Sequence, residues 1–354
     1  MRLISYGRQT IDKDDVREVA RVLKSDWITQ GPKIEEFESS LARYCGARYA
    51  VCVSSGTAAL HLACMAAGIR KGDEAITSPI TFLATANSIL YTGAKPVFSD
   101  INFETGNIDP CAIEKKISRK TKAILPVHFA GLPCDLLRIY EIARKNGVMV
   151  IEDACHALGA EYKFRGRWVK VGSCHHSDMT VFSFHPVKSI TTGEGGAVVT
   201  NNNKLHLLLK ALRSHGMYRD DMTAKNGPWY YEMRGLGFNY RITDFQCAMG
   251  LSQLKKIGYF LNRRRTIAEI YNKRLSDIDE ILLPMEGKGV RSSWHLYAIR
   301  INESRNASAI RKDFFNYLLK NRIKPQVHYI PVYWHPYYKK LGYKKGLCLK
   351  AEEF

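Results

Sequence analysis

"VFSFHPVKSITTGEGGAVVT" (residues 181–200) places one lysine, Lys188, between two apolar segments that are typical of buried β-strands. Threonines and glycines fill the interval, which indicates a tightly turned connection. A lysine in such a connection is ordinarily expected to be a solvated surface residue. Phe182, Phe184 and Val187 permit a second interpretation, because apolar walls lower the pKa of a lysine and so free its amine to act as a nucleophile.

The sequence before this stretch alternates between strand-like and helix-like patterns. Apolar, β-prone runs are each followed by a helical segment or a turn at residues 48–54, 74–78, 95–101, 121–129 and 148–153. Strict alternation of this kind predicts βαβ units and therefore an α/β fold with a mostly parallel sheet. Sheets of that type bind ligands at the carboxyl ends of their strands, so reactive side chains are expected there.

The two ends of the chain carry other patterns. Helical spacing predicts helices at residues 11–24, 243–257, 259–276 and 311–321, and a Gly-Pro break precedes another amphipathic helix that ends at Gly46. The segment 292–301 alternates like a strand, and a Pro- and Tyr-rich tail follows at 324–343. We therefore expect a large α/β domain over residues 1–245 and a small α+β domain over residues 246–354.

Composition narrows the functional class. The chain has 354 residues, 45% of them hydrophobic, with no apolar run long enough for a transmembrane helix and no apolar leader at its start. Its nine cysteines lack a disulfide framework, which predicts reduced thiols and a cytoplasmic protein. The net charge of +19 suggests anionic partners, but the basic residues are dispersed and no helix-turn-helix is evident, so neither nucleic acid nor a membrane is an expected partner.

Two further strand ends carry polar groups. "SSGTAAL" (54–60) opens a helix, so the amides of Gly56 and Thr57 and the Thr57 hydroxyl form a candidate anion site; an ordinary helix cap is the alternative. "VMVIEDACHALGA" begins with an apolar strand that ends in Glu152 and Asp153. A carboxylate at this position must be paired or functional, because an unpaired buried charge is costly.

These three features together meet the needs of pyridoxal 5′-phosphate (PLP). A lysine can bond to its aldehyde, an aspartate can keep its pyridine nitrogen protonated, and an anion site can hold its phosphate. Ser183 could contribute to the same phosphate site as Thr57. Each feature is weak alone, but their order on an α/β scaffold favours a PLP enzyme over a solvated loop lysine.

The chain also resembles a known family, the DegT-type sugar-nucleotide aminotransferases. The resemblance lies in "SGTAAL", "SPITFLATANSILYTGAKPVFSDI", "EDACHALGA", "SDMTVFSFHPVKSITTGEGGAVVT" and "GFNYRITDFQCAMGLSQL", and it extends over nearly the whole chain. It implies a PLP-dependent transferase of fold type I, with a mostly parallel, seven-stranded central sheet between helices. It also implies a homodimer whose subunits share their active sites.

Three segments, "ISYGRQTIDKDD", "FSFHPVKSITTGEGG" and "PQVHYIPV", are most similar to the pseudaminic acid branch of that family. This implies transfer of an amino group from L-glutamate to C4 of UDP-2-acetamido-2,6-dideoxy-β-L-arabino-hexos-4-ulose, which yields UDP-4-amino-4,6-dideoxy-N-acetyl-β-L-altrosamine. Pyridoxamine 5′-phosphate would carry the amino group between the two half-reactions. C4 or C3 amination of another UDP- or dTDP-linked keto-sugar is the alternative.

By matched position, the resemblance assigns roles to individual residues. Lys188 corresponds to the Schiff-base lysine, Asp153 to the partner of the pyridine nitrogen, and His156 to the residue near the phenolic oxygen. Phe82 corresponds to the ring that stacks on the cofactor, although without the resemblance it would be interpreted as a core residue. The other cofactor contacts are Ser55, Gly56, Thr57, Ser183 and Asn239, the last of which reaches the neighbouring subunit's site.

A second set of positions matches segments that contact the sugar nucleotide. Tyrosine and tryptophan in loops are as often packing residues, so packing stays the alternative for this set. Its members are Tyr6, Trp27, Ile28, Thr29, Gln30, Gly31, His185, Asn239, Val327, His328, Tyr329 and Ile330.

Rival interpretations explain less of the sequence. A dehydratase on the same scaffold lacks the lysine, and a cysteine desulfurase needs a mobile-loop cysteine, whereas Cys155 and Cys348 are better explained as incidental thiols. A PLP-free basic regulator would require a DNA-binding element. The "CHH" at 174–176 lacks further ligands, so no metal is expected. The family continues beyond "CLKAEEF" with a strand and a helix, so the small domain is expected to be incomplete.

Overall fold

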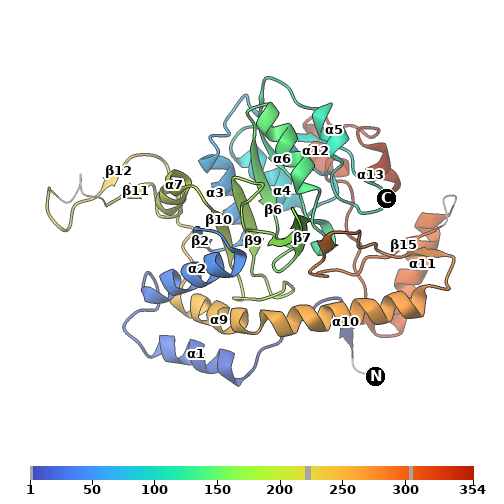
Figure 1. The fold of residues 1–354 in the computed structure, drawn as a ribbon, viewed down its shortest axis with the longest axis horizontal. Helices are drawn as coiled ribbons and strands as arrows, with labels where there is room; N and C mark the ends of the chain where they lie inside the picture. The colour runs from blue at the N-terminus through green and yellow to red at the C-terminus, as the bar shows by residue number, and fades with distance from the viewer. Residues whose placement is uncertain (1–2, 220–224, 303–305) are drawn as a thin grey trace.

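A seven-stranded sheet forms the centre of the computed structural model, which describes residues 3–219, 225–302 and 306–354 (Figure 1). In spatial order the strands are β2 (Tyr49–Val53), β10 (Gly196–Thr200), β9 (Met179–Ser183), β6 (Met149–Asp153), β5 (Thr121–Leu125), β3 (Glu74–Thr77) and β4 (Lys95–Phe98). Only β10 runs against its neighbours; the other adjacent strands pair in parallel. The predicted α/β fold with a mostly parallel, seven-stranded sheet is confirmed.

Helices cover both faces of this sheet. Side chains of β2 show why: Val51 and Val53 pack into one core with α3, whereas Ala50 and Cys52 pack into another with α2. The first face carries α3 (Gly56–Ala66), α4 (Leu83–Tyr91) and α7 (Asn203–Arg213). The second carries α2 (Pro32–Cys45), α5 (Pro110–Glu114), α6 (Leu136–Lys145), α9 (Asp244–Lys255) and the start of α10 (Ile257–Leu275).

A buried ion pair ties both layers to β2. Arg213 Nη1 on α7 donates to Glu38 Oε1 on α2 at 2.5 Å and to the Cys52 carbonyl at 2.7 Å. The Cys52 N–H donates to the same carboxylate oxygen at 2.8 Å. The pair therefore fixes the strand that leads into the "SSGTAAL" turn, because its charges are matched and hydrogen-bonded inside the protein.

The N-terminal helix α1 (Lys13–Leu23) is held to the junction of α9 and α10. A capping box between Asp12 and Asp15 closes its first turn, and Lys256 Nζ contacts both carboxylates at 2.7–2.8 Å. The helices predicted at 11–24, 243–257 and 259–276 are confirmed, with ends that differ by a few residues. Cys247 and Leu254 of α9 belong to the large core, and the domain boundary at residue 245 stays a prediction.

The remaining elements are mostly short. They are β1 (Ile4–Ser5), η1 (Phe129–Gly131), β7 (Glu161–Phe164), β8 (Arg167–Lys170), β11 (Met217–Tyr218), β12 (Glu232–Met233), β13 (Ile281–Leu282), β14 (Val290–Arg291), β15 (Arg300–Ile301), α11 (Ala307–Lys320), β16 (Ile323–Lys324), η2 (Val332–Trp334), α12 (Pro336–Lys340) and α13 (Leu349–Glu353). In Figure 1 the arm made by β11 and β12 extends away from the body of the molecule. No described helix is both long and apolar enough to cross a membrane.

The strand predicted at 292–301 is largely wrong, because only Arg300 and Ile301 form a strand. Ser293 instead bonds to two loops of the large core: its N–H donates to the Gly131 carbonyl at 3.1 Å and its hydroxyl to the His156 carbonyl at 2.7 Å. The alternating pattern thus reflects a segment docked by loop contacts, which use up the backbone groups that a strand would pair.

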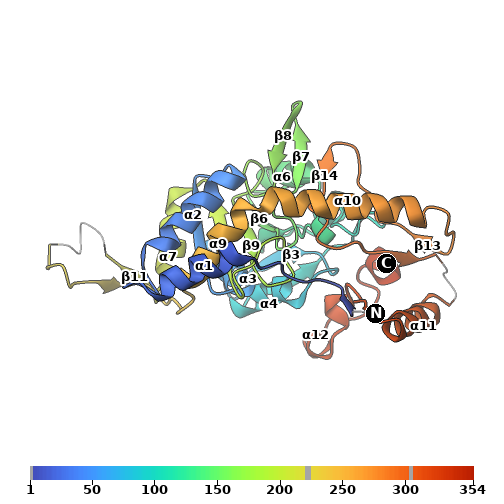
Figure 2. The same cartoon turned by 90° about the horizontal axis from the view of Figure 1, so that it is seen from below.

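The start of the described chain forms a small parallel pair with a segment from the last third of the sequence. Ile4 and Ser5 of β1 align with Ile323 and Lys324 of β16. Figure 2 shows the N-terminus beside α11 and α12, far along the sequence. The residues just after β1 and β16 are therefore held near each other.

Candidate active site

The Lys188 stretch is a hairpin excursion between two paired strands. Ser183 at the end of β9 aligns with Gly196 at the start of β10, and the Phe184 N–H donates to the Gly195 carbonyl at 2.8 Å. Both aromatic neighbours considered in the sequence, Phe182 and Phe184, are fully buried. The loop that carries Lys188 is thus closed at its base and supported by the core.

Lys188 itself is partly buried. Its N–H donates to the His185 carbonyl at 2.9 Å, which turns the loop, while the His185 side chain is exposed. Burial lowers the pKa of Lys188, and nearby Cys155 and Asp153 oppose that shift. A lysine with a lowered pKa is deprotonated more readily and can serve as a nucleophile or a base.

The "SSGTAAL" turn meets the end of β9. A Cβ on Gly56 would lie 2.9 Å from Ser183 Cβ and 3.2 Å from Ser183 Oγ, so only glycine allows this approach. Ser55 caps α3, its hydroxyl accepting the Ala58 N–H at 3.1 Å. The first turn of a helix leaves further N–H groups for an anion, and Gly56, Thr57 and Ser183 surround this helix start.

Asp153 lies at the end of β6 with only 5% of its surface exposed. Thr85 on α4 donates its hydroxyl to Asp153 Oδ2 at 2.6 Å, and the Cys155 N–H donates to Oδ1 at 3.1 Å. The carboxylate is therefore held from two sides. Its negative charge is near enough to Lys188 to oppose the lowering of the lysine pKa.

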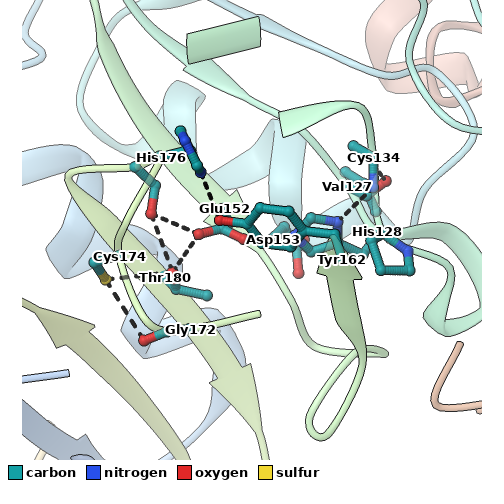
Figure 3. A network of polar contacts seen from close by, with 12 residues as sticks. Val127, His128, Cys134, Glu152, Asp153, Tyr162, Gly172, Cys174, His176 and Thr180 are labelled. Carbon is teal, nitrogen blue, oxygen red and sulfur yellow. Dashed lines mark hydrogen bonds and ion pairs between the residues drawn. The ribbon is translucent and has the colours of Figure 1, made fainter. Parts of the chain in front are cut away.

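The adjacent carboxylate, Glu152, faces the other way into a hydrogen-bond network (Figure 3). It accepts from His128 Nε2 at 2.8 Å, Ser177 Oγ at 2.5 Å and Thr180 Oγ1 at 2.7 Å. Burial alone would raise the pKa of Glu152, but these hydrogen bonds outweigh it and lower the pKa. His128 Nδ1 accepts the Cys134 N–H at 3.0 Å, so the proton of His128 sits on Nε2, toward Glu152.

Aromatic and histidine rings line the side of the site near His156. Tyr329 stacks on His156, with its hydroxyl 3.4 Å from Nε2, and the Tyr6 ring lies 5.7 Å from that of His328. Burial and then nearby Lys188 lower the pKa of His328 to about 4, and the same two causes hold that of His156 well below its ordinary value. These histidines are thus neutral at physiological pH.

Phe82 is the residue just before α4 and is 59% exposed. The alternative that it belongs to the core is therefore wrong. The first turn of α4 also carries Thr85, which donates to Asp153. The exposed Phe82 ring and the hydrogen bond to the Asp153 carboxylate therefore come from neighbouring residues of the chain. Val327 and Ile330 are exposed as well, beside Tyr329.

The turn of residues 27–31 is held elsewhere, against the start of α9. Asp244 accepts the Gly31 N–H at 2.8 Å, and the Asp244 N–H donates to the Ile28 carbonyl at 3.0 Å. Trp27, Ile28, Thr29 and Gln30 are exposed. Asn239 is also exposed and lies a few residues before α9. The carbonyl of the next residue, Tyr240, accepts the Ser54 N–H at 2.8 Å. Two groups of predicted substrate residues therefore exist, one around His328 and one around α9.

Two side chains near the site were not selected from the sequence. Thr85 contacts Asp153, and the His295 ring lies 4.3 Å from that of His156. Thr85 lies in a sequence predicted to be helical and His295 in one predicted to be a strand. No local sequence pattern therefore identifies either as a site residue. Their proximity depends on how α4 and the 292–295 segment dock onto the strand ends.

The arrangement fits PLP on structural grounds. A glycine-walled helix start can take a phosphate, a buried and hydrogen-bonded carboxylate can face a pyridinium, and a partly buried lysine lies beside it. His156 adds a buried Nδ1 without a hydrogen-bond partner, in the part of the chain described. Such an atom is costly unless a ligand or water pairs with it.

Comparisons with known proteins agree with this arrangement. The DegT/DnrJ/EryC1/StrS aminotransferase family profile matches residues 9–354. The chain is 41% identical over 347 residues to the spore coat polysaccharide biosynthesis protein SpsC of Bacillus subtilis, covering 97% of this chain and 87% of the relative. It is 40% identical over 342 residues to a UDP-4-amino-4,6-dideoxy-N-acetyl-beta-L-altrosamine transaminase of Campylobacter jejuni, covering 96% and 87%.

Solved structures match as well. PseC of Helicobacter pylori, an aminotransferase involved in the biosynthesis of pseudoaminic acid, superposes with a TM-score of 0.90 at 35% identity, covering 99% of this chain and 92% of that one. The sugar aminotransferase Spr1654 of Streptococcus pneumoniae, in its PMP-form, gives 0.90 at 31% identity, covering 98% and 90%.

Glu152→Gln tests the network behind Asp153. At neutral pH we expect the free energy of unfolding to fall by about 1–3 kcal/mol. The glutamine side chain would place its NH2 group against His128, Ser177 or Thr180, all of which donate hydrogen bonds to Glu152 in the wild type. This deficit should shrink as the pH falls below the ordinary glutamate pKa of 4.5, because the unfolded wild type then binds a proton at Glu152 that the folded protein, with its lowered pKa, binds only at lower pH. Urea unfolding at several pH values measures both effects.

Glu141→Gln on the exposed side of α6 is the matched control, and its unfolding free energy should hardly change. A deficit for Glu152→Gln that is constant from neutral to acid pH would contradict the assigned ionisation of Glu152.

Proposed function

Because the chain belongs to the DegT/DnrJ/EryC1/StrS aminotransferase family and is a PLP-dependent sugar aminotransferase, we propose that it aminates C4 of UDP-2-acetamido-2,6-dideoxy-β-L-arabino-hexos-4-ulose, with L-glutamate as the donor. The product would be UDP-4-amino-4,6-dideoxy-N-acetyl-β-L-altrosamine. The convergence of Lys188, Asp153 and the Gly56–Ser183 contact at one edge of the sheet carries the transamination chemistry, and the similarity to the Campylobacter jejuni transaminase and to PseC supports the choice of sugar. PLP supplies an electron sink that no side chain offers.

Each of these residues has a role in the proposal. Lys188, with its lowered pKa, would take the proton from the donor carbon that bears the amino group and deliver it to the cofactor within the same half-reaction, and it would move a proton from the cofactor to the sugar carbon in the second half-reaction. Asp153 holds the ring nitrogen protonated. Gly56, Thr57 and Ser183 bind the phosphate, and Ser55 shapes that turn as its helix cap. Phe82 provides an exposed ring for stacking.

His156 is assigned to the phenolic oxygen of PLP. Because burial keeps its ring neutral, it can donate a hydrogen bond from one nitrogen without adding a positive charge next to Lys188. Tyr329 supports the ring from the side. His328 and Tyr6 then continue the same wall toward the exposed residues Val327 and Ile330, where we place part of the sugar nucleotide.

We further infer a homodimer in which the 27–31 turn and Asn239 serve the partner's site. Within one subunit the turn is held by Asp244 at the start of α9, and Asn239 lies a few residues before that helix, in an isolated β-bridge to Ser214 just after α7. The arm near β12 exposes Trp229, Met233 and Leu236, which favours a protein contact. A helix start that binds the phosphate would then receive Asn239 of the partner subunit as a further donor.

A second substrate is favoured by one specific observation. The relative from Bacillus subtilis is about as similar as the one from Campylobacter jejuni, and its name places it in spore coat polysaccharide synthesis. C4 or C3 amination of another UDP- or dTDP-linked keto-sugar is therefore the alternative. The two proposals share every cofactor contact and differ only in the sugar-facing residues.

A panel of nucleotide-linked keto-sugars separates the two proposals. We expect purified enzyme with PLP and glutamate to aminate the UDP-linked 4-keto-6-deoxy sugar at least tenfold faster than dTDP-linked or 3-keto analogues, a ratio of about 1.4 kcal/mol in transition-state binding. Mass spectrometry of the sugar product, with NMR to locate the amine, measures it. Faster turnover of a dTDP-linked or 3-keto sugar would reject the first proposal in favour of the second.

Lys188→Ala should abolish turnover, because it removes the amine to which the proposal assigns the proton transfer. We expect a loss of about 10³-fold or more in kcat, with the variant still folded. Steady-state rates and borohydride labelling of the wild type at residue 188 test this. Lys204→Ala, at an exposed position of α7, is the control and should keep wild-type rates. Near-normal transamination by Lys188→Ala would refute the assignment.

Paired variants test the shared site. Lys188→Ala and Asn239→Ala subunits carrying different tags are co-expressed and the mixed dimer is purified. If Asn239 serves the partner, one site is intact and the other carries both changes, so the mixed dimer should show about half of wild-type activity although each parent is impaired. If Asn239 acts within its own subunit, neither site is intact and activity should not exceed that of the Asn239→Ala parent.

A further inference from the structure

The buried hydroxyl of Thr85 contacts the Asp153 carboxylate and is shielded from solvent. Thr85 is fully buried and Thr81 is 3% exposed. Thr85 Oγ1 lies 2.6 Å from Asp153 Oδ2 and 2.8 Å from Thr81 Oγ1. The three side chains therefore form a short chain of hydrogen bonds that begins before α4 and ends at the carboxylate.

The direction of these hydrogen bonds follows from the carboxylate at which they end. An ionised carboxylate only accepts hydrogen bonds, so the single proton of Thr85 must point to Asp153. Thr85 can then only accept from Thr81, which donates. A hydroxyl that accepts one hydrogen bond is polarised and donates more strongly to the next group.

The other carboxylate oxygen is held by backbone. The Cys155 N–H donates to Oδ1 at 3.1 Å, and β6 fixes the Asp153 backbone through its N–H to the Pro126 carbonyl at 2.9 Å. Thr85 thus makes the shorter of these two hydrogen bonds to the carboxylate, and together with the Cys155 N–H it fixes the rotation of the carboxylate plane, while the Cys155 side chain lies beside the same carboxylate.

We propose that Thr85, oriented by Thr81, is a positioning residue that fixes the orientation of the Asp153 carboxylate for the pyridine nitrogen of PLP. This rests on the proposed role of Asp153. The same turn presents Phe82, so the stacking ring and the carboxylate orientation are set together by the docking of α4. Thr85 does not touch the reacting atoms and is not a catalytic residue.

Thr85→Val tests the proposal, because valine keeps the shape and loses the donor. A carboxylate without this donor holds a proton more strongly, so the proton shared with the ring nitrogen moves toward Asp153. We expect the pH dependence of the bound-PLP absorption spectrum to shift and kcat of the glutamate half-reaction to fall about tenfold to hundredfold, with KM for glutamate changed less than about threefold. Thr85→Ser should restore both.

Thr77→Val is the matched control. Thr77 is also fully buried, and its hydroxyl donates to the Leu125 carbonyl at 2.9 Å, away from Asp153. It should lose comparable stability in urea while keeping the wild-type spectrum and kcat. Thr81→Val should produce an intermediate spectral shift, because Thr85 keeps its proton for Asp153 but loses polarisation.

The outcomes separate this inference from the proposed function. The spectrum requires only bound PLP, so it decides the role of Thr85 even when the sugar substrate is wrongly assigned. A Thr85→Val enzyme whose spectrum, kcat and KM match those of Thr77→Val would overturn the inference. A spectral shift that Thr85→Ser fails to reverse would also overturn it, since the hydroxyl would then not be the cause.

Discussion

Two carboxylates at the end of β6 face opposite sides of the sheet, and the rest of the site depends on how both are satisfied. Glu152 turns into a network of His128, Ser177 and Thr180, which is entirely buried. Asp153 turns toward α4 and Lys188. Strand alternation alone makes this division, because neighbouring side chains of a strand point to opposite faces. Glu152 thereby anchors the end of the strand, while the Asp153 carboxylate faces the side of the sheet that carries Lys188.

Much of this could be predicted from the sequence because it depends on local signals. Apolar runs and the segments after them locate five strands, and polar residues at the strand ends locate Gly56, Asp153 and Lys188. Parallel order then brings those ends to one edge. The matched segments also predicted a PLP-dependent sugar aminotransferase, which the family match confirms. The strands and the PLP site needed only the period of the strands and the chemistry of single side chains, whereas the sugar aminotransferase activity came from the family resemblance.

What the sequence could not predict depends on docking between distant segments. Residues 292–299 alternate like a strand, yet their partners are loop carbonyls at Gly131 and His156, which no pattern announces. Thr85 sits in an ordinary helical sequence, and its contact with Asp153 exists only once α4 lies on the sheet. His295 reaches His156 in the same way. Phe82 is apolar, so only its exposed position distinguishes it from a core residue.

The closed base of the Lys188 loop has a consequence for how this enzyme can change. Ser183 and Gly196 are locked side by side, so everything between them leaves and re-enters the sheet at one point. Ser189, Ile190, Thr191 and Thr192 are buried and tie the second half of the loop to the core, whereas residues 185–187 are exposed or half-buried and can change without altering the strand register on either side. Evolution or an engineer can therefore retune the reach and surroundings of the amine while the scaffold beneath it stays intact.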